Sequence, residues 1–291
     1  MIKSILTVAA VLSCCVILHA DYLSDRKAAL ELVKGAKNEE ALLLFTKMAE
    51  GPYTDFQKSD ALEQAAMTAQ ALKKGDQAME LAKRIPLVPA SKTVQMRLMN
   101  DTRNWQGIVD AFKNENIEDW PEELIGEASH LRGQAYYQIR DGKATVADLE
   151  KAAEYLTDSN SKGLALNMLG DTYASLLKDD ARALETYRSV YKNPNIYKAG
   201  AAAMGAAGIL AKQNKLDEAM SELKTIDMDK VTHPYWRASL LAAYGGILSK
   251  QGKKSEAISK YKEAAELKDI PASQKALYEK IIKDFETDTR Q

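Results

Sequence analysis

Apolar residues recur along this chain at helical intervals, and the stretch Trp236–Pro271 shows the pattern most clearly. Leu241, Tyr244 and Leu248 follow one another at steps of three and four residues, which place side chains on one face of a helix. Gly252 then interrupts the pattern where a helix end favours a left-handed backbone conformation. A second helical pattern follows and ends at the proline. The stretch therefore predicts two helices joined by a tight turn.

The same helical pair recurs through the chain, and a small residue on the inner face of each second helix marks it. Successive markers are 37, 29, 38, 38, 36 and 38 residues apart, which is the signature of a helical repeat array. No sustained period-two alternation or hairpin signal interrupts the pattern after Ser24. The sequence therefore predicts an all-α array of about seven helix pairs. The markers are Ala41, Ala78, Gly107, Thr145, Ala183, Ala219 and Ala257.

One further helix, from Pro271 to about Asp288, follows the last pair and has no successor. A repeat array needs such an end, because each unit buries its apolar face only against its neighbours. The helix is therefore expected to cap the array, with Leu277, Ile281 and Phe285 directed towards the last pair.

These spacings resemble a known repeat family. Leu169, Gly170 and Tyr173 form a Leu-Gly-x-x-Tyr pattern, Ala183 and Tyr187 follow on the second helix, and a proline comes seven residues later. The set resembles the tetratricopeptide repeat (TPR), with one extra residue in the turn between the helices. The resemblance implies a right-handed α-solenoid of TPR-like helix-turn-helix repeats with a C-terminal capping helix. It also implies a concave groove that the first helix of each pair lines.

The resemblance divides the chain. It is good over about residues 122–267 and loose before residue 113, where no Leu-Gly pair occurs. We therefore expect four parts: a signal peptide, divergent N-terminal TPR-like repeats, well-formed TPR-like repeats, and a capping helix with a tail. Their residue ranges are 1–20, 21–120, 121–270 and 271–291.

Composition is that of an ordinary folded protein: hydrophobic residues make up 46% of the 291 residues and charged residues 28%. The formal net charge is −1, from 40 basic and 41 acidic side chains. This balance argues against a nucleic-acid partner and against a polybasic membrane patch.

The N-terminus predicts export. Lys3 precedes an apolar run from Ile5 to Leu18, which suits a signal peptide better than a membrane span of about 20 residues. The small residue Ala20 stands directly before the polar Asp21, so a cut between them is expected. Two alternatives remain open: an uncleaved N-terminal anchor, and a lipoprotein acylated on Cys14.

Both cysteines, Cys14 and Cys15, precede the expected cut, so the mature chain would hold neither disulfides nor thiol chemistry. Export combined with a cysteine-free body favours a bacterial envelope, as a periplasmic or secreted protein. The membrane would then be a partner only through an uncleaved or lipidated N-terminus.

Candidate chemistry is sparse. His130 and His233 fall in separate repeats, without the spacing of a metal site. Acidic pairs such as Glu122-Glu123 stand at helix starts, where the helix dipole accounts for them. Gly200, Gly205 and Gly208 lie in an Ala/Gly-rich helical stretch rather than in a phosphate-binding loop. The sequence therefore predicts no catalytic residues, no metal and no cofactor, and a protein that is not an enzyme.

The resemblance implies a scaffold that binds a protein or peptide of unknown identity in the groove. The Lys, Asn and Arg set by which chaperone-binding members clamp a peptide carboxylate is missing, so a tail ending in Glu-Glu-Val-Asp is not the expected ligand. Tyr137 is the expected anchor, because it follows the packing residue Tyr136 and points away from it. By position, the groove residues are His130, Gln134, Tyr137, Gln138, Asn167, Asp171, Ser175, Met204, Lys212, Ser249 and Lys250.

Two other classes stay open at this point. One is a cell-wall-associated enzyme subunit of the solenoid lytic transglycosylase type that lacks its catalytic domain. The other is a self-assembling structural protein. Hydrolysis of purified cell-wall material would favour the first, and concentration-dependent oligomers without a partner would favour the second.

Overall fold

The computed structural model describes residues 21–287, and all the regular structure in that range is helical. The expected signal segment and both cysteines lie outside the described residues. The chain divides into two compact units between Ala135 and Tyr136, and each is described by itself.

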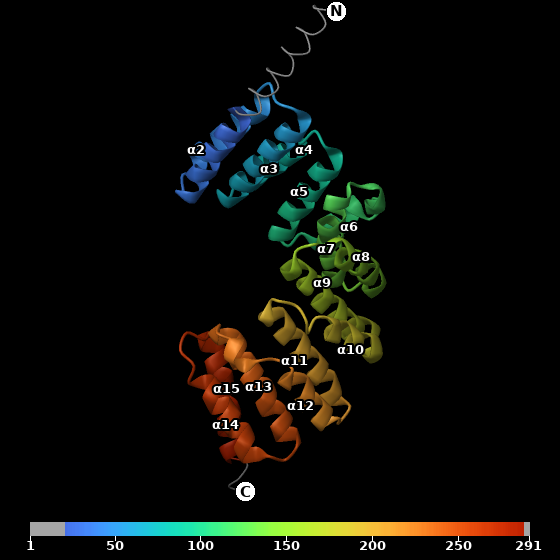
Figure 1. The fold of residues 1–291 in the computed structure, drawn as a ribbon, viewed down its shortest axis with the longest axis vertical. Coiled ribbons are helices and arrows are strands. Elements are labelled where there is room, and N and C mark those ends of the chain that lie inside the picture. The colour runs from blue at the N-terminus through green and yellow to red at the C-terminus, as the bar shows by residue number, and fades with distance from the viewer. Residues whose placement is uncertain (1–20, 288–291) are drawn as a thin grey trace, which may run out of the picture. The chain divides into compact units, whose positions relative to one another are not determined.

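Unit 1 is a succession of antiparallel helix pairs (Figure 1). The first helix of each pair is followed by a shorter partner, and α3 contacts both α2 and α4 before α5 packs beside it. The helices are residues 21–34, α2 (Asn38–Glu50), α3 (Asp55–Ala71), α4 (Gly75–Lys83), α5 (Val88–Asp101), α6 (Trp105–Phe112), a 3-10 turn (Ile117–Asp119) and most of α7 (Glu122–Gln138).

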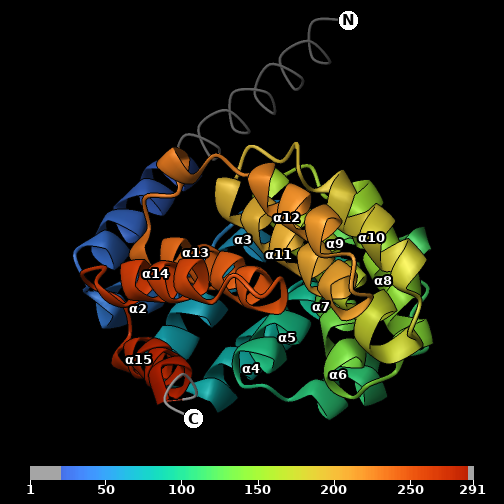
Figure 2. The ribbon, with the colours of Figure 1, turned by 90° about the horizontal axis from the view of Figure 1, so that it is seen from below.

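Unit 2 continues the alternation. First helices α9, α11 and α13 contact one another in sequence, and each also contacts its own second helix (Figures 1 and 2). The helices are α8 (Gly142–Tyr155), α9 (Ser159–Thr172) with a π-helical turn (Tyr173–Leu177), α10 (Asp180–Ser189), α11 (Ile196–Lys212), α12 (Leu216–Lys224), a 3-10 turn (Met228–Lys230), α13 (Pro234–Lys250), α14 (Lys254–Ala265) and α15 (Ala272–Thr287). The expected all-α helix-pair architecture is confirmed.

A residue with a left-handed backbone marks the turn inside each pair. Gly252, with φ of 76°, is the one that the sequence predicted. The others are not glycines, and a side chain in this conformation costs about 1–2 kcal/mol. These turn residues are 37, 30, 37, 38, 36 and 38 residues apart, which repeats the spacing of the small markers. They are Ala36, Lys73, Arg103, Arg140, Lys178, Asn214 and Gly252.

The extra residue expected in the fifth pair is absorbed in the π-helical turn that ends α9. Lys178 follows this turn in the left-handed conformation, and the N–H of Asp179 closes it by donating to the carbonyl of Tyr173 at 2.8 Å. The Asp179 side chain then caps α10 by accepting from the N–H of Arg182 at 3.1 Å. The helix pair keeps its packing although its spacing is one residue longer.

The expected small residues make room for tyrosine rings rather than for a neighbouring backbone. A Cβ added to Gly170 would lie 2.5 Å from the ring of Tyr187, and one added to Gly245 would lie 2.9 Å from the ring of Tyr261. Both rings are buried. The pairing of a glycine on the first helix with a tyrosine on the second is therefore a steric requirement of the fold.

The capping helix α15 packs as expected but in a different register. Leu277, expected to face the array, is 54% exposed, whereas its neighbour Tyr278 is 4% exposed. Tyr278 packs in a cluster with Leu241 and Tyr261, and Ile281 and Phe285 flank that cluster as predicted. The aromatic ring fills the site because its hydroxyl also accepts from Gln274 Nε2 at 2.8 Å, a partner that leucine cannot have.

Candidate partner-binding face

One stripe of first-helix residues in unit 2 is left open by the packing. Counted back from the left-handed turn residue, Gly208 and Gly246 each stand six positions earlier. Asp171 stands seven positions before Lys178, and the extra residue of the π-helical turn accounts for the difference. We call the surface around Asp171, Gly208 and Gly246 the first-helix face of unit 2. On α11 and α13 the backbone forms the floor of this face, because Gly208 and Gly246 carry no side chain.

The equivalent stripe in unit 1 is closed by ion pairs. Arg97 on α5 stands six residues before Arg103. Its guanidinium lies 2.8 Å from Glu63 on α3 and 2.7 Å from Glu127 on α7, and these two carboxylates raise the pKa of Arg97 against the effect of burial. This arrangement satisfies the charges internally. The two units therefore present chemically different first-helix faces.

Tyr187 connects the two helix layers of unit 2. Its buried ring, carried by α10, lies between Gly170 of α9 and Gly205 of α11, since a Cβ on either glycine would come within 2.6 Å of it. The Tyr187 hydroxyl donates to Asp171 Oδ1 at 2.5 Å. Burial raises the pKa of Tyr187, and the nearby Asp171 and Tyr137 raise it further. Tyr187 therefore stays neutral at physiological pH.

Asp171 is an exposed carboxylate that the protein nevertheless partly desolvates. Removal of water by the surrounding protein raises the pKa of Asp171, and the hydrogen bond from Tyr187 opposes this shift only in part. Among residues 21–287 it has no ion-pair partner, and Tyr187 supplies its side-chain hydrogen bond. Charged groups in such surroundings are concentrated at functional sites.

The structure places the sequence-predicted groove residues at different depths. Exposed ones are Gln138, Asp171, Ser175, Lys212 and Lys250. Half-buried ones are His130, Gln134, Tyr137, Asn167, Met204 and Ser249. His130 and Gln134 belong to unit 1 and the rest to unit 2.

Several of these residues also hold repeats together. Asn167 Nδ2 donates to the carbonyl of Lys198 at 3.0 Å and so links α9 to α11. Met204 packs against the hydrophobic cluster of α11 to α13. Lys250 Nζ donates to the carbonyl of Ala211 at 3.2 Å, where a cation compensates the negative end of α11. Among residues 21–287, the predicted unit 2 residues whose side-chain polar groups remain open are Tyr137, Gln138, Asp171, Lys212 and Ser249.

Two important features were missed from the sequence. Tyr187 was assigned only to packing, because helical spacing shows which face a side chain takes but not how far its hydroxyl reaches. Gly208 and Gly246 were not singled out as an open floor; a Cβ on Gly208 would meet nothing within 4 Å. Each lies six residues before the left-handed turn residue of its helix pair, and this equal spacing is the signal in the sequence that could have identified them.

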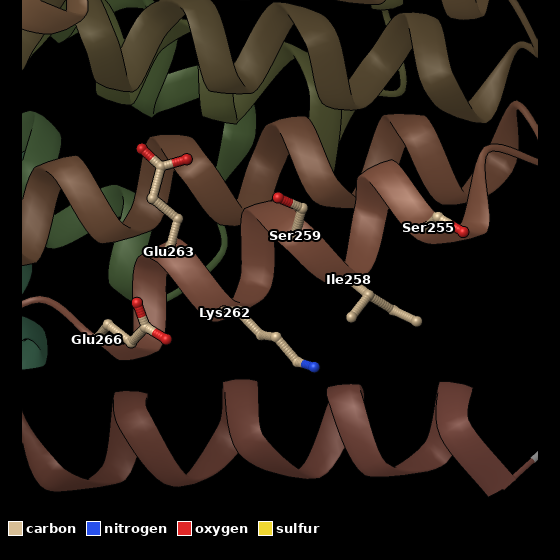
Figure 3. Close-up of a pocket in the computed structure, with 6 residues that line it drawn as sticks. All are labelled: Ser255, Ile258, Ser259, Lys262, Glu263 and Glu266. Carbon is tan, nitrogen blue, oxygen red and sulfur yellow. The ribbon is translucent and has the colours of Figure 1, made fainter.

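Unit 2 also has hollows elsewhere on its surface. One, of about 510 Å³, lies on α14 beside α15 and is drawn in Figure 3. There Ile258 and Lys262 point towards the neighbouring helix, and Lys262 pairs with Glu286 of α15 at 3.2 Å. Smaller hollows of about 300 and 200 Å³ lie beside Tyr173 and Tyr244.

The described part of the chain contains no group of three or more His, Cys, Asp or Glu side chains placed to hold a metal ion. Within residues 21–287, the helices are also too short or too polar to cross a bilayer. The first-helix face of unit 2 is therefore the candidate site.

No protein-family model and no curated protein matches the sequence. Solved structures do. A tetratricopeptide repeat protein from Parabacteroides merdae aligns over 91% of this chain and 98% of its own, with a TM-score of 0.52 at 16% identity. The C-terminal part of a TPR repeat-containing protein from Cytophaga hutchinsonii aligns over 85% and 97%, with a TM-score of 0.53 at 15% identity.

The chain has a TPR-type fold. The identities are low, so the likeness concerns the fold and carries no partner from those proteins to this one. The helix-pair array is a scaffold of the kind that suits protein–protein interaction.

Proposed function

We propose that this protein is a non-catalytic scaffold in a bacterial envelope, and that it binds a peptide segment of a partner protein on the first-helix face of unit 2. The observation that carries the proposal is the open stripe of Asp171, Gly208 and Gly246. Two glycines in register let a partner backbone approach the floor closely, and an unpaired carboxylate borders it.

The contrast between the units supports this choice. Arg97 closes the equivalent stripe of unit 1 with two carboxylates, so its polar groups are already satisfied. Burying a satisfied ion pair under a partner would cost desolvation without forming new contacts. The open face of unit 2 offers new hydrogen bonds instead.

A peptide library tests the proposal without a known partner. The library displays peptides of random sequence, each about 12 residues long and able to cross several helices. Peptides that bind a protein of residues 21–291 are selected from it. The enriched peptide is then synthesised, and hydrogen exchange is measured with and without it. We expect new protection in α9, α11 and α13. A failure to enrich any peptide, or protection confined to α10, α12 and α14, would overturn the assignment.

Lys212 and Lys224 provide a matched pair for the same test. Both are exposed, lie at helix ends of the same repeat and form no ion pair or side-chain hydrogen bond with another residue from 21 to 287. Lys212 lies on the first helix and Lys224 on the second. Lys212→Ala should weaken binding of the enriched peptide and Lys224→Ala should not; the reverse result would place the site on the second helices.

Export is part of the proposal and has its own support. Tyr22 is buried, and its hydroxyl hydrogen-bonds to the carbonyl of Gln57 at 3.0 Å and to the Asp60 carboxylate. Arg26 pairs with the same Asp60 at 2.6 Å. Tyr22, two residues after Ala20, therefore belongs to the packed structure, and a cut after Ala20 would leave it in the mature chain.

Mass spectrometry of the protein from the envelope fraction tests the export step. The expected N-terminus is Asp21. A chain that starts at an acylated Cys14 would be a lipoprotein, and a chain that keeps Met1 or Ile2 would be anchored; either result would overturn cleavage after Ala20 and leave the binding proposal intact.

A further inference from the structure

The first-helix face of unit 2 holds one charged group in an unusual setting, the carboxylate of Asp171. The residue is exposed, yet no described residue forms an ion pair with it. Some other exposed acids of the described chain are paired instead: Glu31, for example, lies 2.7 Å from Lys34. Asp171 has neither a cationic neighbour nor a capping role.

Tyr187 fixes the position of this carboxylate. The tyrosine ring is held between Gly170 and Gly205, so its hydroxyl is rigidly placed and holds Asp171 Oδ1 at 2.5 Å. The second oxygen, Oδ2, keeps its hydrogen-bonding capacity, because no residue in the described range donates to it. The outcome is a preorganised acceptor with one side open.

Tyr137 is a second tyrosine near Tyr187. Its phenol is half-buried at the end of α7 and lies close enough to Tyr187 to raise the pKa of that tyrosine. Its hydroxyl takes part in no hydrogen bond within residues 21–287. Aromatic side chains beside a carboxylate favour a cation, since a ring face attracts an ammonium or guanidinium group.

The arrangement costs the protein stability. Because the pKa of Asp171 is raised, the folded chain holds the proton more tightly than the unfolded chain does. The ionised carboxylate therefore disfavours folding at neutral pH, and that loss is recovered as the pH falls through the raised pKa. A destabilising group on an open face is typical of a site kept for binding.

The chemistry of the ligand follows from the groups present. An anion would be repelled by Asp171 and would find no guanidinium or ammonium beside it. A metal ion would need more ligands than this face provides among the described residues. An organic cation supplies both the missing charge and a donor for Oδ2.

We propose that the Asp171 carboxylate, held by Tyr187, binds a lysine or arginine side chain of the partner segment. The inference rests on the proposed function and adds the chemistry that selects the partner. Gly208 on α11, the next first helix, would accommodate the backbone of that segment, because a Cβ there would meet nothing within 4 Å.

The same displayed library tests the inference. Peptides enriched on residues 21–291 should share a lysine or arginine at a fixed position. In the synthetic peptide, norleucine in place of that residue keeps the aliphatic chain and removes the charge, and it should weaken binding by about tenfold in calorimetry. Asp171→Asn should weaken the parent peptide similarly. The Asp171→Asn variant should bind the norleucine peptide only slightly more weakly than the parent protein does, because both changes remove the same interaction.

Two controls separate recognition from folding. Asp229→Asn makes the same change in charge at an exposed position of the same unit, where the carboxylate forms no ion pair with any residue from 21 to 287, and it should bind within about twofold of the parent. Asp171→Asn should melt at the same temperature as the parent or higher, which excludes misfolding as the cause of weaker binding.

The outcomes also separate this inference from the proposed function. Enriched peptides without a shared basic residue, or equal binding by Asp171→Asn and the parent, would overturn the inference while leaving peptide binding in place. A library that enriches nothing would overturn both.

Discussion

Tyr187 and Tyr261 explain the positions of two glycines in this fold. Each ring occupies the volume in which a Cβ of the glycine on the partner first helix would lie, at 2.5 Å for Gly170 and 2.9 Å for Gly245. Neither ring can retreat, because both are buried on all sides. A steric conflict at these sites must therefore move a helix or a ring.

Gly170→Ala should lower the free energy of unfolding by about 1–3 kcal/mol, because overpacking outweighs the better helix propensity of alanine. Gly208→Ala is the matched control: its Cβ meets nothing within 4 Å, so it should raise stability by up to about 1 kcal/mol. Chemical denaturation measures both. Equal effects of the two changes would contradict the placement of Tyr187.

The sequence predicted the packing contacts of these residues better than it predicted the surroundings of Asp171. The helical spacing placed Tyr187 and Gly170 in the packing stripe, and the structure confirms this. It could not show that the hydroxyl of Tyr187 emerges beside Asp171, because that depends on ring depth and on a second glycine, Gly205, in the next repeat. Spacing along one helix carries no such information.

At the scale of the element, the turns inside the helix pairs carry an unexpected strain. Gly252 is the expected left-handed residue, but Lys73 and Arg140 adopt the same conformation with φ of 61° and 67°. A lysine or arginine gives no sequence signal for this, so these turns could be located only by the end of the apolar pattern.

The strain leads to a prediction. Lys73→Gly and Arg140→Gly should each raise the free energy of unfolding by about 0.5–1 kcal/mol, because glycine adopts a positive φ without steric cost. Lys47→Gly, at an exposed position inside α2, is the control and should lower it by about 1 kcal/mol. If urea titrations show that the two turn variants are as destabilised as the control, Lys73 and Arg140 do not have the left-handed backbone conformation.

At the scale of the molecule, most of the architecture followed from the sequence. Repeats of helix pairs, the longer turn near Lys178 and a final capping helix were all predictable, since each unit repeats the same local solution. The register of α15 was not, because Leu277 and Tyr278 are adjacent and either could face the array by helical period alone. The Gln274 hydrogen bond that selects the tyrosine involves a side chain four residues away.

The two neighbours in α15 give a final test of how the array is held at its end. Tyr278→Ala removes a buried ring whose centroid lies 6.2 Å from the centroid of the Tyr261 ring. The change should lower the free energy of unfolding by about 3 kcal/mol. Leu277→Ala removes an exposed side chain and should change stability by less than about 0.5 kcal/mol.

Repeat arrays couple mainly through nearest neighbours. Hydrogen exchange in the tyrosine variant should therefore speed up in α13, α14 and α15 and stay unchanged in α9 and α10. Uniform acceleration through unit 2 would show instead that the unit unfolds as one cooperative block, and a larger effect of the leucine change would reverse the register of the capping helix.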